Sequence, residues 1–119
     1  MLLTDMHVHS CFSSDSEEKP ENIIETAINK GFQFIYFTDH HDTDFPVNPA
    51  DPAMTFQLDF DAYTKKILEL RERYKDKIQV MLGVEQGICP ETAPKISAIS
   101  NAYPFDFIIG SSHLTRLDN

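Results

Sequence analysis

The sequence predicts a single α/β domain with a parallel sheet, and three observations support this fold class. Short apolar runs alternate with longer stretches of helical periodicity, so that four predicted strands are separated by three predicted helices. Each helical stretch is long enough to cross over between parallel neighbours. Histidine and acidic residues follow the predicted strands directly, which is expected where a site forms at the carboxyl edge of a parallel sheet.

Composition is that of an ordinary globular chain of 119 residues, 41% hydrophobic and 24% charged. The formal charge is −9, with 19 acidic and 10 basic residues and no basic patch, which argues against a nucleic-acid partner. No apolar stretch is long enough to span a membrane, and no secretory signal precedes the first strand. We therefore expect no membrane association and a cytoplasmic location.

The first strand is expected over residues 2–9, and a polar loop over residues 10–19 follows it. A helix is predicted over residues 20–31, because Pro20 suits a first helical position and Gly31 a helix end. Its apolar stripe is Ile23, Ile24, Ala27 and Ile28.

The remaining elements follow the same alternation. The later strands are predicted over residues 32–38, 78–84 and 105–110, and the later helices over residues 59–74 and 92–103. The clearest helix has Phe60, Tyr63, Ile67, Leu70 and Tyr74 at steps of three and four, which predicts a core-facing stripe. Residues 43–58 contain three prolines and form a long loop, a length typical of functional or disordered segments.

The two histidines His7 and His9 lie two residues apart at the end of the first predicted strand. Side chains at such positions point to the same face, so both imidazoles can approach one metal ion. For this pair alone, chance or a structural role is the favoured explanation of the spacing. The pattern gains weight because His40, Glu85 and His113 follow the three later strands. Imidazoles with carboxylates suit Zn, Mn or Fe, with Mg at carboxylate-rich positions.

A family resemblance rests on these motifs taken together and in order. They are His7-x-His9, Asp15, Thr38-Asp39-His40, Gly83-Val84-Glu85 and Gly110-Ser111-Ser112-His113. The set resembles the first motifs of the PHP (polymerase and histidinol phosphatase) superfamily. The phrases around His40 and His113 are most similar to its histidinol-phosphatase branch.

The resemblance implies a distorted (β/α)₇ barrel of which residues 1–119 form the amino-terminal portion, about half of a family domain. It also implies up to three divalent ions at the carboxyl face. His7, His9 and Glu85 would hold the first ion, Glu85 and His113 the second, and Asp15 and His40 the third. The remainder of the barrel would come from further carboxyl-terminal sequence or, as the less favoured alternative, from a second copy of the chain.

The implied reaction is hydrolysis of L-histidinol phosphate in histidine biosynthesis, with a metal-bound hydroxide as nucleophile and no catalytic side chain beyond the metal ligands. Arg116 is a candidate phosphate-binding cation, although a solvated arginine is an equal alternative. Asp39, His41 and Asp42 are candidates to orient ligands, and for His41 an exposed loop position is expected.

Two other functions remain open on the sequence. One is a PHP-type metal phosphoesterase with a different substrate, such as another small phosphorylated metabolite or a nucleic-acid end. The other is a metal-binding fragment without activity, because the ligand set in these residues is incomplete for the family.

Overall fold

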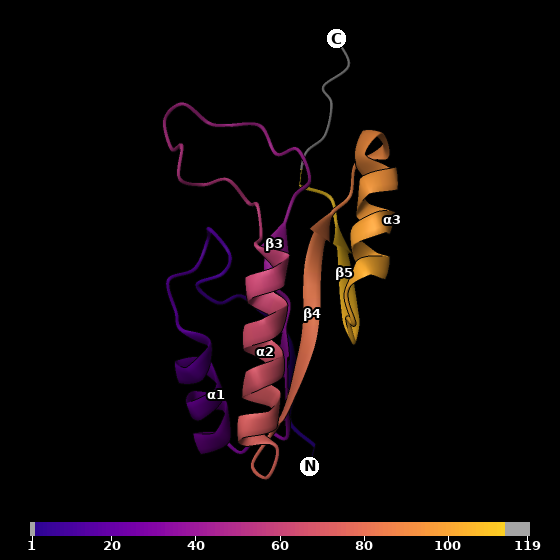
Figure 1. Ribbon diagram of the computed structural model, residues 1–119. Coiled ribbons are helices and arrows are strands. Elements are labelled where there is room, and N and C mark those ends of the chain that lie inside the picture. Colours follow the sequence, from indigo (N-terminus) through magenta and orange to yellow (C-terminus); the bar gives the residue numbers. More distant parts are fainter. Residues whose placement is uncertain (1, 114–119) are drawn as a thin grey trace.

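The computed structural model describes residues 2–113, and these contain the predicted alternation of strands and helices (Figure 1). The elements are β1 (Thr4–Val8), α1 (Pro20–Asn29), β2 (Phe34–Phe37), β3 (His40–His41), α2 (Phe60–Tyr74), β4 (Gln79–Gly87), the 3₁₀ turn η1 (Pro90–Thr92), α3 (Ala93–Ala102) and β5 (Phe107–Ser111). None of the helices in this range is long and apolar enough to cross a membrane.

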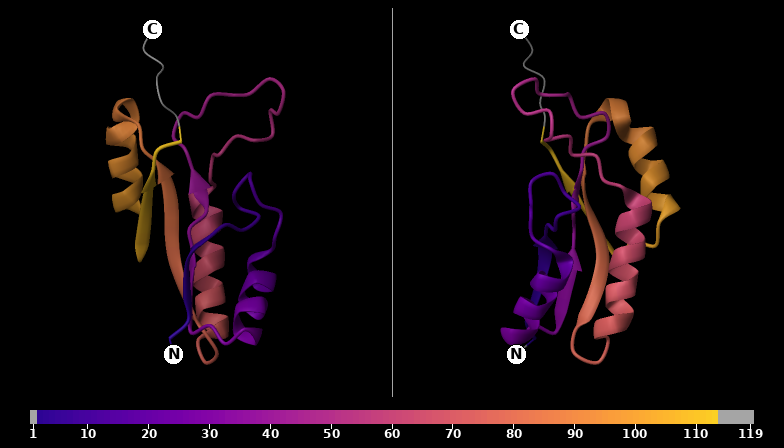
Figure 2. Two further views of the ribbon diagram at one scale, coloured as in Figure 1. Left: turned by 180° about the vertical axis from the view of Figure 1, so that it is seen from behind. Right: turned by 60° about the vertical axis from the view of Figure 1, so that its left-hand side comes forward.

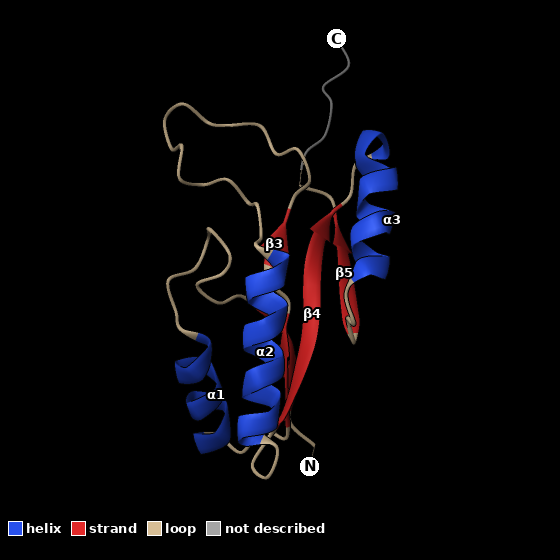
Figure 3. Cartoon of the chain, in the orientation of Figure 1, coloured by secondary structure: helices blue, strands red, loops and turns tan. Residues whose placement is uncertain are grey.

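The sheet is parallel at every pairing. β2 lies between β1 and β4, and β5 pairs with the other side of β4. The two-residue strand β3 continues along β4 past the end of β2, with His40 opposite Glu85. All carboxyl ends therefore point the same way, and the long loop after β3 lies at that end of the sheet (Figure 3).

One face of the sheet forms the hydrophobic core with α1 and α2. Ile35 and Phe37 of β2, and Val80, Leu82 and Val84 of β4, are buried against the helices. The helices contribute Ile24, Ala27, Phe60, Tyr63, Ile67 and Leu70. The predicted stripe of the second helix is confirmed, except that Tyr74 is only partly buried.

The opposite face of the sheet has no helix on it in the described part of the chain, as the view from behind in Figure 2 shows. It nevertheless carries apolar side chains, among them Phe34, Tyr36, Met81 and Phe107, which are only half-buried. Tyr36 and Phe107 make an edge-to-face contact with ring centroids 5.6 Å apart. An apolar inner face on a curved parallel sheet is the pattern of a barrel interior, so the described residues form part of a barrel wall.

Helix boundaries follow local chemistry. Asp59 caps α2, its side chain accepting a hydrogen bond from the Ala62 N–H at 3.1 Å. α1 begins at Pro20 and is followed by Gly31, whose φ of 81° places it in the left-handed region that glycine tolerates. These ends lie within a few residues of the predicted ones, as expected for boundaries.

Three features differ from the sequence predictions. β4 continues to Gly87, so Glu85 lies within a strand instead of following one. His40 and His41 form β3 although a loop was expected, because β4 is long enough to offer them partners. The exposed position predicted for His41 is wrong: its residue exposure is 5%, and its Nδ1 accepts a hydrogen bond from the Leu58 N–H at 3.0 Å.

Candidate metal centre

The predicted ligand residues converge at the carboxyl end of the sheet. His7 is in β1 and His9 follows it, His40 is in β3, Glu85 is in β4, and His113 lies two residues beyond β5. The rings of His7 and His9 are 5.1 Å apart, and those of His40 and His113 are 4.1 Å apart. Side chains from four strands are thus brought within contact distance of one another.

Glu85 occupies the centre of this arrangement and is almost completely buried. Its Oε1 contacts Nε2 of His7 and lies 3.1 Å from Nε2 of His9. Its Oε2 lies 2.7 Å from Nε2 of His113 and 3.8 Å from Nε2 of His40. Each carboxylate oxygen therefore faces a different pair of imidazoles.

Two groups have the spacing of metal ligands among the described residues. The first is His7, His9 and Glu85, and the second is His40, Glu85 and His113. Within each group the donor atoms all lie within 4.8 Å of one another. Because Glu85 belongs to both groups, it is placed to bridge two cations, which a carboxylate can do with its two oxygens.

Asp15 lies beside these groups, in the loop after β1. Its carboxylate is 3.0 Å from Nδ1 of His9 and 3.7 Å from Nδ1 of His40. The structure thus brings Asp15 to the centre and next to His40, while His40 itself also belongs to the group around Glu85. An ion held by Asp15 and His40 remains a prediction.

Electrostatics favour cation binding at Glu85. Burial alone would raise the pKa of Glu85, but the hydrogen bond with His7 and the neighbouring imidazoles outweigh it and lower the pKa. Burial would lower the pKa of His113, but the hydrogen bond to Asp42 and the charges of Asp42 and Glu85 raise it. Glu85 is consequently held in the anionic form that metal ligation requires.

A buried polar network beneath the candidate centre joins Asp39, which the sequence analysis named, to Ser10 and Ser13, which it did not. The Asp39 carboxylate, 0% exposed, accepts hydrogen bonds from Ser10 N–H at 2.6 Å, Ser10 Oγ at 2.9 Å and Ser13 Oγ at 2.9 Å. Ser13 Oγ in turn accepts from the His40 N–H at 2.6 Å. Burial raises the pKa of the Asp39 carboxyl group. The network ties the loop after His9 to the strand that carries His40.

Ser10 and Ser13 have no distinguishing sequence signal, because serine is common in polar loops. The sequence signal that could have pointed to them is Asp39, an acidic residue at the end of a buried strand. A buried carboxylate requires hydrogen-bond donors, and nearby serines can provide them. The predicted candidate cation Arg116 lies outside the described residues.

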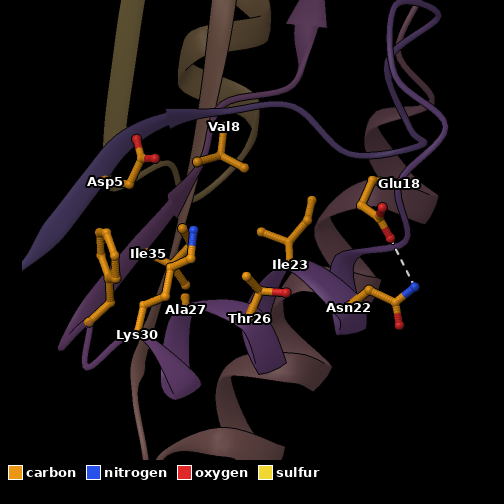
Figure 4. Close-up of a pocket in the computed structure, with 10 residues that line it drawn as sticks. Asp5, Val8, Glu18, Asn22, Ile23, Thr26, Ala27, Lys30 and Ile35 are labelled. Atoms are coloured by element: carbon orange, nitrogen blue, oxygen red, sulfur yellow. Dashed lines mark hydrogen bonds between the residues drawn. The ribbon is translucent and has the colours of Figure 1, made fainter.

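A groove lies away from the candidate ligands, between α1 and the edge strand β1 (Figure 4). Its lining is apolar at the centre, with Val8, Ile23 and Ala27, and polar at the ends, with Asp5 and Glu18. Neither group of candidate ligands lines it. The groove is therefore a feature of the β1 edge of the sheet, as far as the structure describes the chain, and is separate from the candidate metal centre.

Comparisons with known proteins agree with the geometry. The family model described as PHP domain matches residues 5–119. A histidinol-phosphatase of Lactococcus lactis is 39% identical over 113 residues, covering 95% of this chain and 40% of that protein. A probable histidinol-phosphatase of Clostridium acetobutylicum is 33% identical, again covering 95% of this chain and 40% of its own length.

A solved structure is also similar. The crystal structure of histidinol phosphate phosphatase from Lactococcus lactis, complexed with zinc, L-histidinol and phosphate, superposes with a TM-score of 0.85 at 38% identity. The match covers 94% of this chain and 40% of that one. This chain therefore spans about 40% of the length of the relatives that it matches.

Proposed function

The chain belongs to the PHP domain family, and from this premise we propose that it forms part of a metal-dependent phosphomonoesterase that hydrolyses L-histidinol phosphate to L-histidinol and phosphate. The observation that carries the proposal is the position of Glu85 between two pairs of histidines at the carboxyl end of the sheet. The relatives named histidinol-phosphatase, and the similar structure with zinc, histidinol and phosphate, support the choice of substrate.

The donor set fits divalent ions. Imidazoles and carboxylates are suitable ligands for Zn, Mn or Fe, and no thiolate lies in either group. We propose that His7, His9 and Glu85 hold one ion, that Glu85 and His113 hold a second with His40 at its edge, and that Asp15 and His40 hold a third. When bound, such ions supply a water of lowered pKa and positive charge for the phosphoryl oxygens.

The protein itself contributes by holding the proposed metal ligands in fixed positions. Glu85 is buried near the carboxyl end of the long strand β4, so its two oxygens hold the histidine pairs at a defined separation. The Asp39 network orders the loop between His9 and Asp15 against β3. This preorganisation lets the ligands meet their ions without rearrangement, which is how a protein scaffold favours the transition state for phosphoryl transfer.

We propose that further β/α units complete the barrel, supplied by additional sequence or, as the less favoured alternative, by a second copy. Such units would cover the half-buried apolar inner face of the sheet, the edge of β1 that has no strand partner among residues 2–113, and the groove beside α1. The length of the relatives supports this proposal.

The test is metal analysis combined with turnover of three substrates: L-histidinol phosphate, p-nitrophenyl phosphate and a single-stranded DNA with a free end. Preference for L-histidinol phosphate, lost on treatment with a chelator, is the expected result. A preference for DNA or for another phosphate ester would favour a different PHP-type phosphoesterase. Bound metal with no turnover of any substrate would favour a metal-binding fragment without activity.

A further inference from the structure

Asp42 makes a contact with His113 that the metal centre does not itself explain. The two residues are separated by 71 positions in the sequence, and Oδ1 of Asp42 lies 3.0 Å from Nδ1 of His113. The other ring nitrogen of His113, Nε2, faces Oε2 of Glu85 at 2.7 Å. One nitrogen thus faces the proposed metal site and the other faces a buried carboxylate.

Gly87 makes this contact possible. A Cβ atom at Gly87 would lie 1.2 Å from Oδ1 of Asp42 and 3.2 Å from Nδ1 of His113. The carboxylate therefore occupies the space that a side chain on β4 would otherwise fill. Any residue larger than glycine at this position has to displace the Asp42 carboxylate.

The backbone of Asp42 is held on both sides by the end of the long loop. Its N–H donates to the Phe56 carbonyl at 2.9 Å, and its carbonyl accepts from Nε2 of Gln57 at 2.6 Å. Asp42 is 5% exposed. The carboxylate is thus fixed in place before any cation binds.

We propose that Asp42 is a positioning residue for His113: its carboxylate accepts a hydrogen bond from the protonated Nδ1, which leaves Nε2 unprotonated and aimed at the cation site next to Glu85. Gly87 is the position that makes room for it. A carboxylate that accepts a hydrogen bond from one ring nitrogen of a histidine, here Nδ1, also raises the basicity of the nitrogen that faces the metal, here Nε2. The inference rests on the metal centre proposed above.

The contact with His40 is consistent with this assignment. Nε2 of His40 lies 2.9 Å from Nδ1 of His113. If Nδ1 of His113 carries the proton between these two nitrogens, Nε2 of His40 is unprotonated. That nitrogen is then free to bind a cation together with Glu85 and His113. Oδ2 of Asp42 has no hydrogen-bond partner among the described residues, although it lies 3.1 Å from His40 Nε2. The competing assignment is therefore that Asp42 is itself a ligand, and the experiment has to separate the two.

The experiment is titration of the chain with Zn²⁺ by calorimetry, using Asp42→Ala, Asp42→Asn, Gly87→Ala and the double variant Asp42→Ala/Gly87→Ala. We expect Asp42→Ala to lower the Zn²⁺ affinity of the site that contains His113 by about 10–100-fold. The Zn²⁺ affinity of the site that contains His7 should be unchanged. Asp42→Asn keeps an oxygen acceptor, so it should restore part of the affinity. Gly87→Ala should reproduce Asp42→Ala, and the double variant should be no worse than either.

The matched controls are Asp44→Asn, in the same loop but exposed and paired with Lys95, and Gly110→Ala, a strand glycine whose Cβ would approach the flexible side chain of Ile88 and no other described side chain. Both should bind Zn²⁺ as the unchanged chain does. Thermal unfolding in chelator should show that the Asp42 variants remain folded.

Nitrogen NMR of the metal-free chain gives a second readout, at a pH where His113 is neutral and with His113→Gln to assign the signal. We expect Nδ1 of His113 to carry the proton in the unchanged chain and to lose that preference in Asp42→Ala. A proton on Nε2 in the unchanged chain, or unchanged Zn²⁺ affinity in Asp42→Ala, would overturn the inference. If Asp42→Asn loses the ion as completely as Asp42→Ala, Asp42 is a ligand and the positioning role is wrong. Absence of Zn²⁺ binding by the unchanged chain would instead contradict the proposed metal centre.

Discussion

The hydroxyl group of Tyr63 donates a hydrogen bond to the carbonyl oxygen of Gly83 at 2.8 Å, two residues before the central carboxylate of the candidate metal centre. Tyr63 lies on α2 and is completely buried. Its hydroxyl oxygen is also 3.4 Å from the N–H of Asp39, at the gap between β2 and β3. Burial raises the pKa of Tyr63 well above its ordinary value, so the group remains a hydroxyl that can donate.

Tyr63→Phe should lower the free energy of unfolding by about 1–3 kcal/mol, because it leaves a buried carbonyl without its donor while preserving the apolar volume. Denaturant unfolding measures the change. Tyr103→Phe is the matched control, because its hydroxyl donates to Asp61 at an exposed position, and its effect should stay within about 0.5 kcal/mol. Equal effects of the two substitutions would contradict the role assigned to the Tyr63 hydroxyl.

Glu85→Gln and His7→Ala should differ in how much metal they remove. Glu85 belongs to both groups of candidate ligands and His7 to one. We expect Glu85→Gln to abolish binding at both groups and His7→Ala to weaken binding at one, as measured by metal content after dialysis. Glu72→Gln is the control, since Glu72 is exposed and paired with Lys75. Full metal content in both Glu85→Gln and His7→Ala would remove these residues from the ligand set.

Asp39→Ala should destabilise the fold by about 1–3 kcal/mol, because the substitution leaves the Ser10 N–H and two serine hydroxyl groups without their buried acceptor. The loop between His9 and Asp15 should also lose protection from hydrogen exchange. Asp51→Ala, at an exposed loop position, serves as the control. A loop that exchanges at the same rate in Asp39→Ala as in the unchanged chain would show that the network does not order it.

His41 should make the stability of the metal-free chain depend on pH. Burial lowers the pKa of His41 from its usual 6.5, and its Nδ1 accepts a hydrogen bond from Leu58, so the folded chain prefers the neutral ring. The contribution of neutral His41 to the free energy of unfolding is complete above the pKa that His41 has in the unfolded chain. It is lost as the pH falls from that value toward the lower pKa that His41 has in the folded chain. Unfolding in chelator from about pH 8 to about pH 5 measures this. His41→Gln should give a flatter profile, and parallel profiles would contradict the prediction.

Local patterns along the chain were sufficient to predict the fold class and most of the elements. The stripe from Phe60 to Leu70 predicts α2 because helical periodicity is encoded in adjacent turns. β3 was not predicted because two residues carry no periodicity of their own. His41 was placed wrongly for a related reason: its burial depends on the chain near Leu58, whose position follows from the path of the long loop.

The sequence by itself determined which side chains gather near the carboxyl ends of the strands, namely His7, His9, His40, Glu85 and His113, because local composition locates each strand to within a few residues. Only the tertiary structure decided how they meet: that Glu85 offers one oxygen to each histidine pair, that Asp39 is bound by Ser10 and Ser13, and that Asp42 reaches His113 over Gly87. These contacts join residues 26 to 78 positions apart. They depend on the register of the parallel strands and on the paths of the loops, which no short stretch of sequence encodes.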